Sequence, residues 1–323
     1  MRILVTGGAG FIGSHTIERL LKPPSESIVC VDSFNDYYDP ALKHANTHGF
    51  AGDSRVKIIE ADVCDPDAMR RLFAAERFTH VIHLAAYAGV RPSVTSPLVY
   101  ERNNVGGTLS LLESARAYPV ERFLLMSSST VYGRGAIGPF VEDAPLGIPL
   151  SPYGATKRAA ELLGLTYCEL HRVPVVCLRP FSVYGPRLRP DLAVAIFAQK
   201  IAAGTPIPLF GDGSFRRDFT HVSDICTALE TALQAPDVVG EAINLGHNEP
   251  IVMRDVIEIL ARAIGRPATI DFQPAKAEDM PLTFADLTKA GRLLDYRPRV
   301  DFKDGIRDYV AWLRATGQIP AIA

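Results

Sequence analysis

The stretch Val5-Thr6-Gly7-Gly8-Ala9-Gly10-Phe11-Ile12-Gly13 joins an apolar run typical of a buried strand to a segment with helical periodicity. It satisfies both Gly7-x-x-Gly10-x-x-Gly13 and Gly8-x-Gly10-x-x-Gly13. Glycines here permit a tight turn, close approach of the backbone to a pyrophosphate, and close packing of the helix on the strand. The free N–H groups and positive dipole of the helix N-terminus also favour phosphate. The stretch therefore predicts the phosphate-binding turn of a dinucleotide-binding fold.

Short apolar runs alternate with helical patterns on the C-terminal side of this turn. Near-continuous hydrophobicity is typical of parallel strands that are covered on both faces. The predicted strands are Ile3–Val5, Ile28–Val31, Val56–Ile59, Val81–Leu84, Phe123–Met126 and Val175–Leu178. The predicted helices between them are Ile12–Leu21, Asp67–Ala75, Val99–Ala117 and Tyr153–Leu170. This order predicts an α/β fold with a doubly wound parallel sheet of the Rossmann type.

The regular alternation ends near residue 180, where proline and glycine become frequent. We expect residues 1–180 to form an NAD-binding Rossmann domain and residues 181–323 to form mainly a smaller C-terminal, substrate-binding lobe. The helical pattern Val222–Leu233 and the strand-like run Ala242–Leu245 could return to the large sheet. We therefore expect part of the segment at about 214–246 to belong to the Rossmann domain.

Asp32 indicates which dinucleotide is bound. It ends the second predicted strand, 19 residues beyond Gly13, where a carboxylate can accept hydrogen bonds from the adenosine ribose hydroxyls. The same carboxylate would repel a 2′-phosphate, so NAD is favoured over NADP as the cofactor. Asp62 and Val63 follow the third strand and could contact the adenine.

A second motif, Tyr153-Gly154-Ala155-Thr156-Lys157, places a phenol and an ammonium four residues apart at the start of a predicted helix. Residues four apart share a helix face, and we expect the lysine to lower the pKa of the tyrosine, as a general base requires. About 25 residues earlier, the serine-rich stretch from Met126 to Gly133 ends a predicted strand. Its hydroxyls would lie where such sheets bind ligands, at the carboxyl ends of the strands.

The composition excludes several other functions. The 323 residues are 47% hydrophobic and 22% charged with a formal net charge of -2, so nothing favours a nucleic-acid partner. The first residues form a strand instead of a signal peptide, and no apolar run is long enough to cross a bilayer. The five cysteines are widely spaced without a C-x-x-C pair, so no disulfide framework or metal site is expected. We expect a cytoplasmic protein with no membrane partner.

Together with the glycine turn, the motifs of this chain resemble the extended short-chain dehydrogenase/reductase family. They are His83-Leu84-Ala85-Ala86, Asn103–Thr108, Ser127–Gly133, Tyr153–Lys157, Arg179–Pro186 and Arg217–Val222. Within that family the chain is most similar to the UDP-glucuronate 4-epimerase branch, because Phe34–Pro40 and Arg189–Ala193 are similar to stretches typical of that branch.

The resemblance implies roles for individual residues. The implied catalytic residues are the base Tyr153, with Lys157, Ser128 and Thr130. The implied NAD-binding residues are Gly7, Gly10, Phe11, Ile12, Gly13, Asp32, Asn35, Asp62, Val63, Leu84, Ala85, Ala86, Asn103, Tyr153, Lys157 and Pro180. The implied substrate-binding residues are Arg91, Ser128, Ser129, Thr130, Ser182, Arg189, Arg217 and Asp279. Lys276 stands where relatives often have arginine, which leaves its contact with the nucleotide open.

The resemblance also leaves a choice among chemistries. Sugar-nucleotide 4,6-dehydratases have an Asp-Glu pair where this chain has Ser129-Thr130, and UDP-glucuronate decarboxylases have Glu at the second position. A non-catalytic NAD-binding regulator would be expected to lack Tyr153 or Lys157, and both are present. The favoured activity is therefore NAD-dependent 4-epimerisation of a UDP-hexuronic acid, UDP-glucuronate or UDP-galacturonate, through a transient 4-keto sugar. UDP-glucose and UDP-N-acetylglucosamine remain alternative substrates.

The resemblance further implies a homodimer formed by the helices Val99–Ala117 and Tyr153–Leu170. Both helices have more apolar residues than one buried stripe needs. These residues include Leu109, Leu111, Leu112, Leu162, Leu163 and Leu165.

Overall fold

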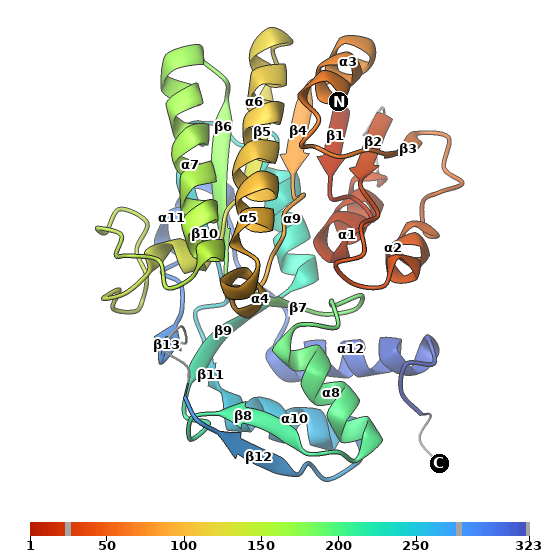
Figure 1. The fold of residues 1–323 in the computed structure, drawn as a ribbon, viewed down its shortest axis with the longest axis vertical. Coiled ribbons are helices and arrows are strands. Elements are labelled where there is room, and N and C mark those ends of the chain that lie inside the picture. Colours follow the sequence, from red (N-terminus) through yellow and green to blue (C-terminus); the bar gives the residue numbers. More distant parts are fainter. Residues whose placement is uncertain (23–26, 276–279, 321–323) are drawn as a thin grey trace.

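The computed structural model describes residues 1–22, 27–275 and 280–320. Its centre is a seven-stranded, wholly parallel sheet with the order β10-β6-β5-β4-β1-β2-β3 (Figure 1). The strands are β1 (Arg2–Thr6), β2 (Ser27–Asp32), β3 (Val56–Glu60), β4 (His80–His83), β5 (Arg122–Met126), β6 (Val175–Pro180) and β10 (Ala242–Leu245). The strand order reverses direction between β1 and β4, which confirms the predicted doubly wound sheet.

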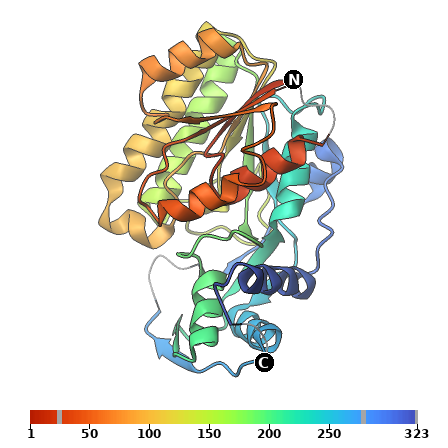
Figure 2. The ribbon, with the colours of Figure 1, turned by 90° about the vertical axis from the view of Figure 1, so that its right-hand side faces the viewer.

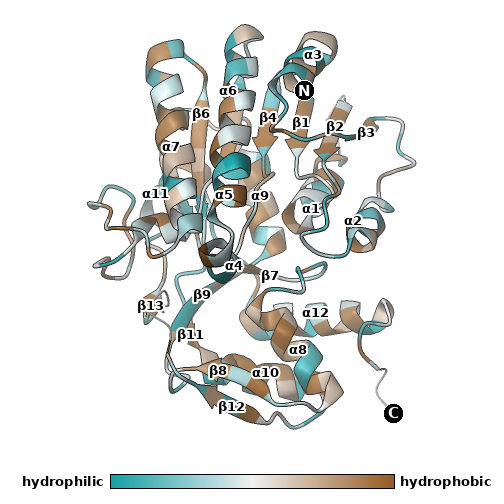
Figure 3. Ribbon diagram, viewed as in Figure 1, coloured by the Kyte–Doolittle hydropathy of each residue, from teal (hydrophilic) through white to brown (hydrophobic). Residues whose placement is uncertain are grey.

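Helices cover both faces of this sheet (Figure 2). One face packs against α3 (Pro66–Glu76), α6 (Gly107–Ala117) and α7 (Pro152–His171). The other face packs against α1 (Phe11–Leu20), α9 (Val222–Ala232) and α11 (Thr288–Leu294), and α2 (Pro40–Thr47) lies beside α1. The strands between these layers are predominantly hydrophobic (Figure 3). Burial of both faces explains why the strands are continuous apolar runs instead of alternating ones.

The predicted helix Val99–Ala117 forms one helical run with an internal irregularity. It begins with α5 (Pro97–Tyr100), continues through a π-helical stretch at Glu101–Gly106, and ends with α6. The short helix α4 (Val90–Thr95) precedes it. Single π-helical turns inside α-helices occur frequently at functional sites, and this one contains Asn103.

A smaller lobe is built around two short sheets. The first pairs β9 (Arg216–His221) with β7 (Ser182–Tyr184), β11 (Pro250–Val252) and β13 (Leu282–Thr283), and the second pairs β8 (Ile207–Phe210) with β12 (Ile270–Gln273). The helices α8 (Ala193–Ala203), α10 (Met253–Ile264) and α12 (Phe302–Ala315) share one apolar core with these strands. Although β9 lies in the smaller lobe, α9 and β10 directly after it pack on or pair within the large sheet. The chain therefore crosses between the lobes within the segment 214–246.

Three properties of the described residues bear on function. None of the helices in residues 1–22, 27–275 and 280–320 has the length and hydropathy needed to cross a membrane. Over the same ranges, no three His, Cys, Asp or Glu side chains gather as a group that could hold a metal ion. All five cysteines are free thiols.

Candidate active site

A cavity of about 590 Å³ opens at the carboxyl ends of the large sheet and extends to the smaller lobe. Open α/β sheets bind ligands at this edge, beside the point where the strand order reverses. Each candidate site residue that the structure describes lines this one cavity. Asp279 and Lys276 lie outside the described residues.

The glycine turn forms one wall of the cavity, and its geometry shows why glycine is required. Gly7 has a φ of +68°, and a Cβ added there would lie 2.8 Å from the backbone nitrogen of Ala85. A Cβ on Gly13 would lie only 2.2 Å from the oxygen of Gly7. Helix α1 follows directly, and its N-cap, Gly10, has no side-chain cap. The turn therefore leaves backbone N–H groups and space for a phosphate.

Asp32 lies in the same cavity at the end of β2. Its carboxylate accepts hydrogen bonds from the backbone nitrogens of Ala9 (3.2 Å) and Phe34 (2.9 Å). Burial raises the pKa of Asp32, whereas the charge of Lys43 and these backbone hydrogen bonds lower it. The carboxylate is thus fixed in orientation and lines the cavity where an adenosine ribose would lie.

Lys43 is a buried residue of this wall that sequence reasoning missed. Its Nζ lies 3.9 Å from the Asp32 Oδ1 and donates hydrogen bonds to the backbone oxygen (2.9 Å) and the Oδ1 (2.8 Å) of Asn35. The side chain is only 6% exposed although it belongs to the short surface helix α2. A lone lysine in a helical pattern is usually solvated, so the sequence contained no signal for this contact.

The tyrosine and lysine of the second motif are placed by the start of α7. Ser151 caps this helix by accepting a hydrogen bond from the Gly154 N–H, so that Tyr153 and Lys157 lie one turn apart. Lys157 Nζ donates a hydrogen bond of 2.8 Å to the backbone oxygen of Met126, and burial lowers the pKa of Lys157 to about 8. Tyr153 and Lys157 both line the cavity.

The expectation that Lys157 lowers the pKa of Tyr153 is wrong for this structure. Burial raises the pKa of Tyr153, and the influences that oppose this increase are a hydrogen bond with Ser128 and the charge of Arg189. The cationic residue that acts on the phenol therefore comes from the loop after β7. Sequence spacing could not reveal this, because Arg189 is distant from Tyr153 along the chain.

The hydroxyl groups after β5 form the floor of the site. Ser128 Oγ accepts hydrogen bonds from the Thr130 backbone nitrogen (3.2 Å) and the Thr130 Oγ1 (2.9 Å). Behind them, Ser127 Oγ donates a hydrogen bond of 2.6 Å to Glu161, which forms a buried ion pair with Arg179. Sequence reasoning did not identify this buried network, which holds the strand end rigidly beneath the cavity.

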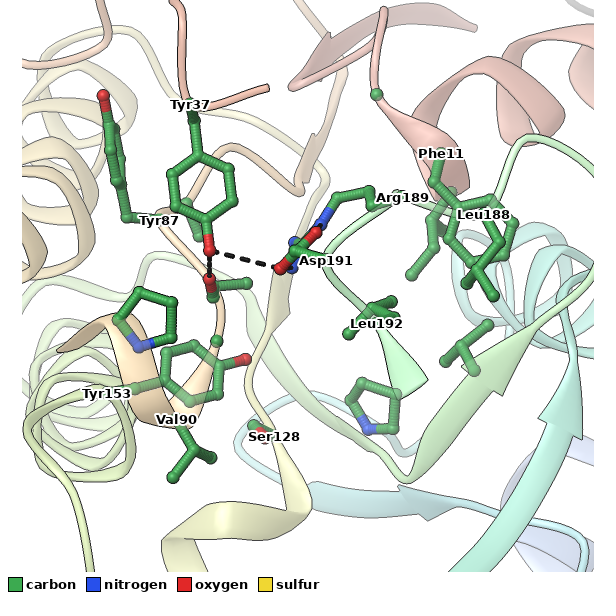
Figure 4. Close-up of a pocket in the computed structure, with 18 of the residues that line it drawn as sticks. Phe11, Tyr37, Tyr87, Val90, Ser128, Tyr153, Leu188, Arg189, Asp191 and Leu192 are labelled. Carbon is green, nitrogen blue, oxygen red and sulfur yellow. Dashed lines mark hydrogen bonds and ion pairs between the residues drawn. The ribbon is translucent and has the colours of Figure 1, made fainter. Parts of the chain in front are cut away.

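Arg189 lies in the cavity wall beside Tyr37 and Asp191 (Figure 4). Its Nε and Nη2 donate hydrogen bonds to the two carboxylate oxygens of Asp191, at 3.0 and 2.8 Å. The guanidinium also lies 5.4 Å from the centre of the Tyr37 ring. Sequence reasoning named Arg189 but did not identify Asp191 or Tyr37 as members of the site.

The remaining candidates line the cavity from both lobes. Asn103 Nδ2 donates a hydrogen bond of 2.8 Å to the oxygen of Val99, within the irregular helical run. The Arg91 guanidinium lies 4.0 Å from the centre of the Phe210 ring. Asp62 forms an ion pair of 2.7 Å with Arg102. Ser182 lies on β7. Arg217 Nη1 donates a hydrogen bond of 2.6 Å to the backbone oxygen of Met280.

These features fit a bound NAD, because the glycine turn offers room and N–H groups for the phosphates and Asp32 offers acceptors for the ribose. A tyrosine and a lysine opening onto the same cavity are the arrangement of a short-chain dehydrogenase/reductase, the class that this fold and site define. More narrowly, the chain belongs to the NAD dependent epimerase/dehydratase family, whose sequence profile matches residues 3–246.

Relatives within the family differ in their chemistry. The chain is 39% identical over 310 residues to a UDP-glucuronate 4-epimerase of Thermodesulfobacterium geofontis, covering 96% of this chain and 95% of the relative. The UDP-glucuronic acid 4-epimerase of Bacillus cereus, solved with UDP-glucuronic acid and NAD, is 36% identical with a TM-score of 0.93, covering 98% and 100% of the two chains. The dTDP-glucose 4,6-dehydratase DesIV of Streptomyces venezuelae is 30% identical with a TM-score of 0.92, covering 98% of both chains. The fold alone therefore does not distinguish epimerase from dehydratase.

Proposed function

We propose that the protein is an NAD-dependent 4-epimerase that interconverts UDP-glucuronate and UDP-galacturonate. The observation that supports this most strongly is the similarity over nearly the whole chain to two UDP-glucuronate 4-epimerases. A cationic side chain, Arg189, also lines the cavity that contains Tyr153. A hexuronic acid supplies the carboxylate that such a side chain would bind.

In the proposed mechanism, Tyr153 accepts the proton of the sugar 4-hydroxyl and later returns it. Ser128 and Thr130 hydrogen-bond the same oxygen and hold it at the end of β5. Bound NAD would supply the hydride acceptor for C4 and the hydride donor for the opposite face of the transient 4-keto sugar. Lys157 holds the nicotinamide ribose, while Asp32 and the glycine turn hold the rest of the dinucleotide. NAD is thus regenerated in each cycle.

The residues after β5 favour epimerisation over dehydration. Elimination of water needs an additional acid and base, and the related dehydratases have an Asp-Glu pair at the position of Ser129-Thr130. Both residues line the cavity, and neither hydroxyl can act as an acid or base near neutral pH. We therefore propose that Ser129 and Thr130 only hydrogen-bond the sugar.

The sugar carboxylate creates a second requirement. Oxidation at C4 places a ketone β to this carboxylate, and a β-keto acid loses CO₂ when the bond to the carboxylate aligns with the carbonyl π system. An epimerase must therefore keep the carboxylate away from that alignment. We propose that Arg189 binds it, since a guanidinium fork matches a carboxylate and a charge-assisted hydrogen bond contributes about 1.5–3 kcal/mol.

We further propose a division of labour between the lobes. Residues 1–180, together with part of the segment 214–246, form the domain that holds NAD. The rest of residues 181–323 mainly holds the UDP-sugar, through Ser182 and Arg217. Asp279 would contribute to the nucleotide site. We also propose a cytoplasmic location.

A homodimer is also proposed, with the run α5–α6 and helix α7 forming its interface. Several leucines on these helices are exposed, and a partner helix would cover them: Leu98, Leu109, Leu162 and Leu170 are 80%, 37%, 57% and 69% exposed. Leu111 and Leu112, in contrast, are fully buried against the sheet and are not available for the interface. Light scattering at micromolar concentration should give twice the monomer mass, and a Leu162→Glu variant should shift it to the monomer.

The proposed activity is tested by incubating the purified protein with a panel of UDP-sugars without added cofactor. NMR of the products should show UDP-galacturonate formed from UDP-glucuronate at a rate well above the conversion of UDP-glucose or UDP-N-acetylglucosamine. A UDP-pentose as the main product would instead indicate a decarboxylase. Efficient epimerisation of UDP-glucose alone would leave the role of Tyr153 intact and refute the role of Arg189.

A further inference from the structure

The segment Arg189-Pro190-Asp191 places a cation and an anion side by side in the wall of the cavity (Figure 4). The Arg189 Nε and Nη2 each donate to one oxygen of Asp191, so the pair is bidentate. The two side chains are only 17% and 27% exposed. A partly buried, bidentate pair of this kind fixes the plane of the guanidinium better than a fully solvated ion pair does.

Tyr37 holds the pair from its other side. The guanidinium lies 5.4 Å from the centre of the Tyr37 ring, and the Tyr37 hydroxyl lies 3.2 Å from Asp191 Oδ2 and 2.5 Å from the oxygen of Ala88. Burial and the neighbouring Asp191 raise the pKa of Tyr37, so this hydroxyl keeps its proton. The aromatic ring and the carboxylate together leave the arginine little freedom to rotate.

The edge of the guanidinium that Asp191 uses determines what remains available. A guanidinium has five N–H donors, and Asp191 engages one on Nε and one on Nη2. Of the remaining three, one N–H of Nη1 and one N–H of Nη2 form the opposite edge, which can bind a second carboxylate bidentately, and the second N–H of Nη1 points back toward Cδ. Asp191 therefore occupies the edge formed by Nε and Nη2, and the edge formed by Nη1 and Nη2 is left for a ligand.

We infer that Asp191 is a positioning residue that orients Arg189 for the carboxylate of a hexuronic acid. The inference rests on the proposed function and deepens it, because it assigns substrate selectivity to a pair of side chains instead of to Arg189 alone. A fixed guanidinium holds the substrate carboxylate in one orientation, which is what a 4-keto hexuronic acid requires if it is to keep its CO₂. A freely rotating arginine would still attract the carboxylate but would not control its direction.

The test compares Asp191→Asn with the wild type, each loaded with NAD. Asparagine keeps the size of the side chain but removes its charge and one acceptor. Calorimetric Kd values and steady-state kcat and KM should be measured for UDP-glucuronate and for UDP-glucose, which lacks the carboxylate. We expect binding of UDP-glucuronate to weaken by about tenfold, the loss typical of a disturbed charge-assisted hydrogen bond, while binding of UDP-glucose stays unchanged. The fraction of decarboxylated product should rise.

Asp191→Glu serves as the conservative variant, since it keeps the carboxylate and should retain most of the preference for UDP-glucuronate. The amount of bound NAD reports whether each variant is folded. If Asp191→Asn leaves the ratio of the two Kd values unchanged, or tightens UDP-glucuronate binding, the inference is overturned while the proposed function stands. If the wild type itself shows no preference for UDP-glucuronate, the proposed function fails first and the inference fails with it.

Discussion

Lys157 Nζ donates a hydrogen bond of 2.8 Å to the backbone oxygen of Met126, the last residue of β5. This bond ties the second turn of α7 to the end of β5, just before Ser128 and Thr130 in the sequence. It also keeps a buried cation at the floor of the cavity, where burial lowers the pKa of Lys157 to about 8. The lysine is therefore an anchored part of the cavity floor instead of a mobile side chain.

Tyr153→Phe tests the assignment of the base. This variant lacks the phenolic oxygen that would accept the proton but keeps the ring, so NAD should remain bound while turnover falls by about 10²–10⁴-fold. Turnover can be followed by NMR, and bound NAD by its absorbance after the protein is denatured. Tyr100→Phe is a matched control, because the Tyr100 ring lies 6.2 Å from that of Tyr153 and its hydroxyl bonds to the Ala88 oxygen. Near-normal turnover in Tyr153→Phe would remove this residue from its role.

Arg189→Ala tests recognition of the carboxylate. Loss of the charge-assisted hydrogen bonds should reduce kcat/KM for UDP-glucuronate by about 10- to 150-fold, which corresponds to 1.5–3 kcal/mol. Activity on UDP-glucose should fall less, through the lost effect of the Arg189 charge on Tyr153 alone, and some UDP-4-keto-pentose should be released. Arg187→Ala is the control from the same segment, since Arg187 pairs with Glu18 at 2.6 Å and does not line the cavity. Equal losses on both sugars would contradict the assignment.

Asp32→Ala tests the preference for NAD over NADP. The substitution removes an acceptor for the ribose hydroxyls and a repulsion toward a 2′-phosphate, and it leaves the buried Lys43 without this carboxylate neighbour. We therefore expect the ratio of the Kd values for NADP and NAD, measured by calorimetry on the cofactor-free protein, to become smaller. Asp62→Ala should leave that ratio unchanged. If Asp32→Ala also left it unchanged, Asp32 would have another function.

His83 predicts a dependence of stability on pH. Its ring is 2% exposed and hydrogen-bonds Thr6 (2.8 Å) and Thr108 (3.0 Å), and burial lowers its pKa from 6.5 to about 3. The folded state therefore binds fewer protons than the unfolded state between these two values. The stabilisation is present above pH 6.5 and is lost as the pH falls toward 3.

This histidine should reduce the free energy of unfolding by about 2 kcal/mol between pH 7 and pH 5. Urea unfolding of the wild type and of His83→Gln at both pH values measures the contribution, because the variant lacks the titrating group. His48→Gln, which replaces an exposed histidine, is the control and should behave like the wild type. A decrease in stability of the same size in His83→Gln would assign the pH dependence to other groups.

The fold was predictable from sequence because its signals are local. Continuous apolar runs identify buried parallel strands, and the turn from Gly7 to Gly13 can be recognised because its glycines recur at a fixed spacing between a strand and a helix. The irregular helical stretch at Glu101–Gly106 was not predicted, because these six residues contain one large apolar side chain and so give no periodicity that separates a π-helical from an α-helical stretch.

The sequence predicted which residues line the site, but it did not predict the contacts that distant segments make there. Tyr153 and Lys157 lie one turn apart on the same helix, which the sequence shows. The effect of Arg189 on the pKa of Tyr153 instead depends on how the loop after β7 folds back toward the sheet. Lys43 and Asp191 were missed for a similar reason. Each acquires its role by being buried against a partner charge, and sequence spacing does not report burial.

The most direct test of the account is to follow the hydrogen at C4 during turnover. UDP-glucuronate carrying deuterium at C4 should be incubated with the NAD-containing protein in ordinary water, and the product should be analysed by NMR and mass spectrometry. Because hydride passes to NAD and returns without meeting solvent, the account predicts UDP-galacturonate that has an inverted C4 and retains the deuterium. UDP-galacturonate that has lost the deuterium to solvent, or no inversion at C4, would contradict it.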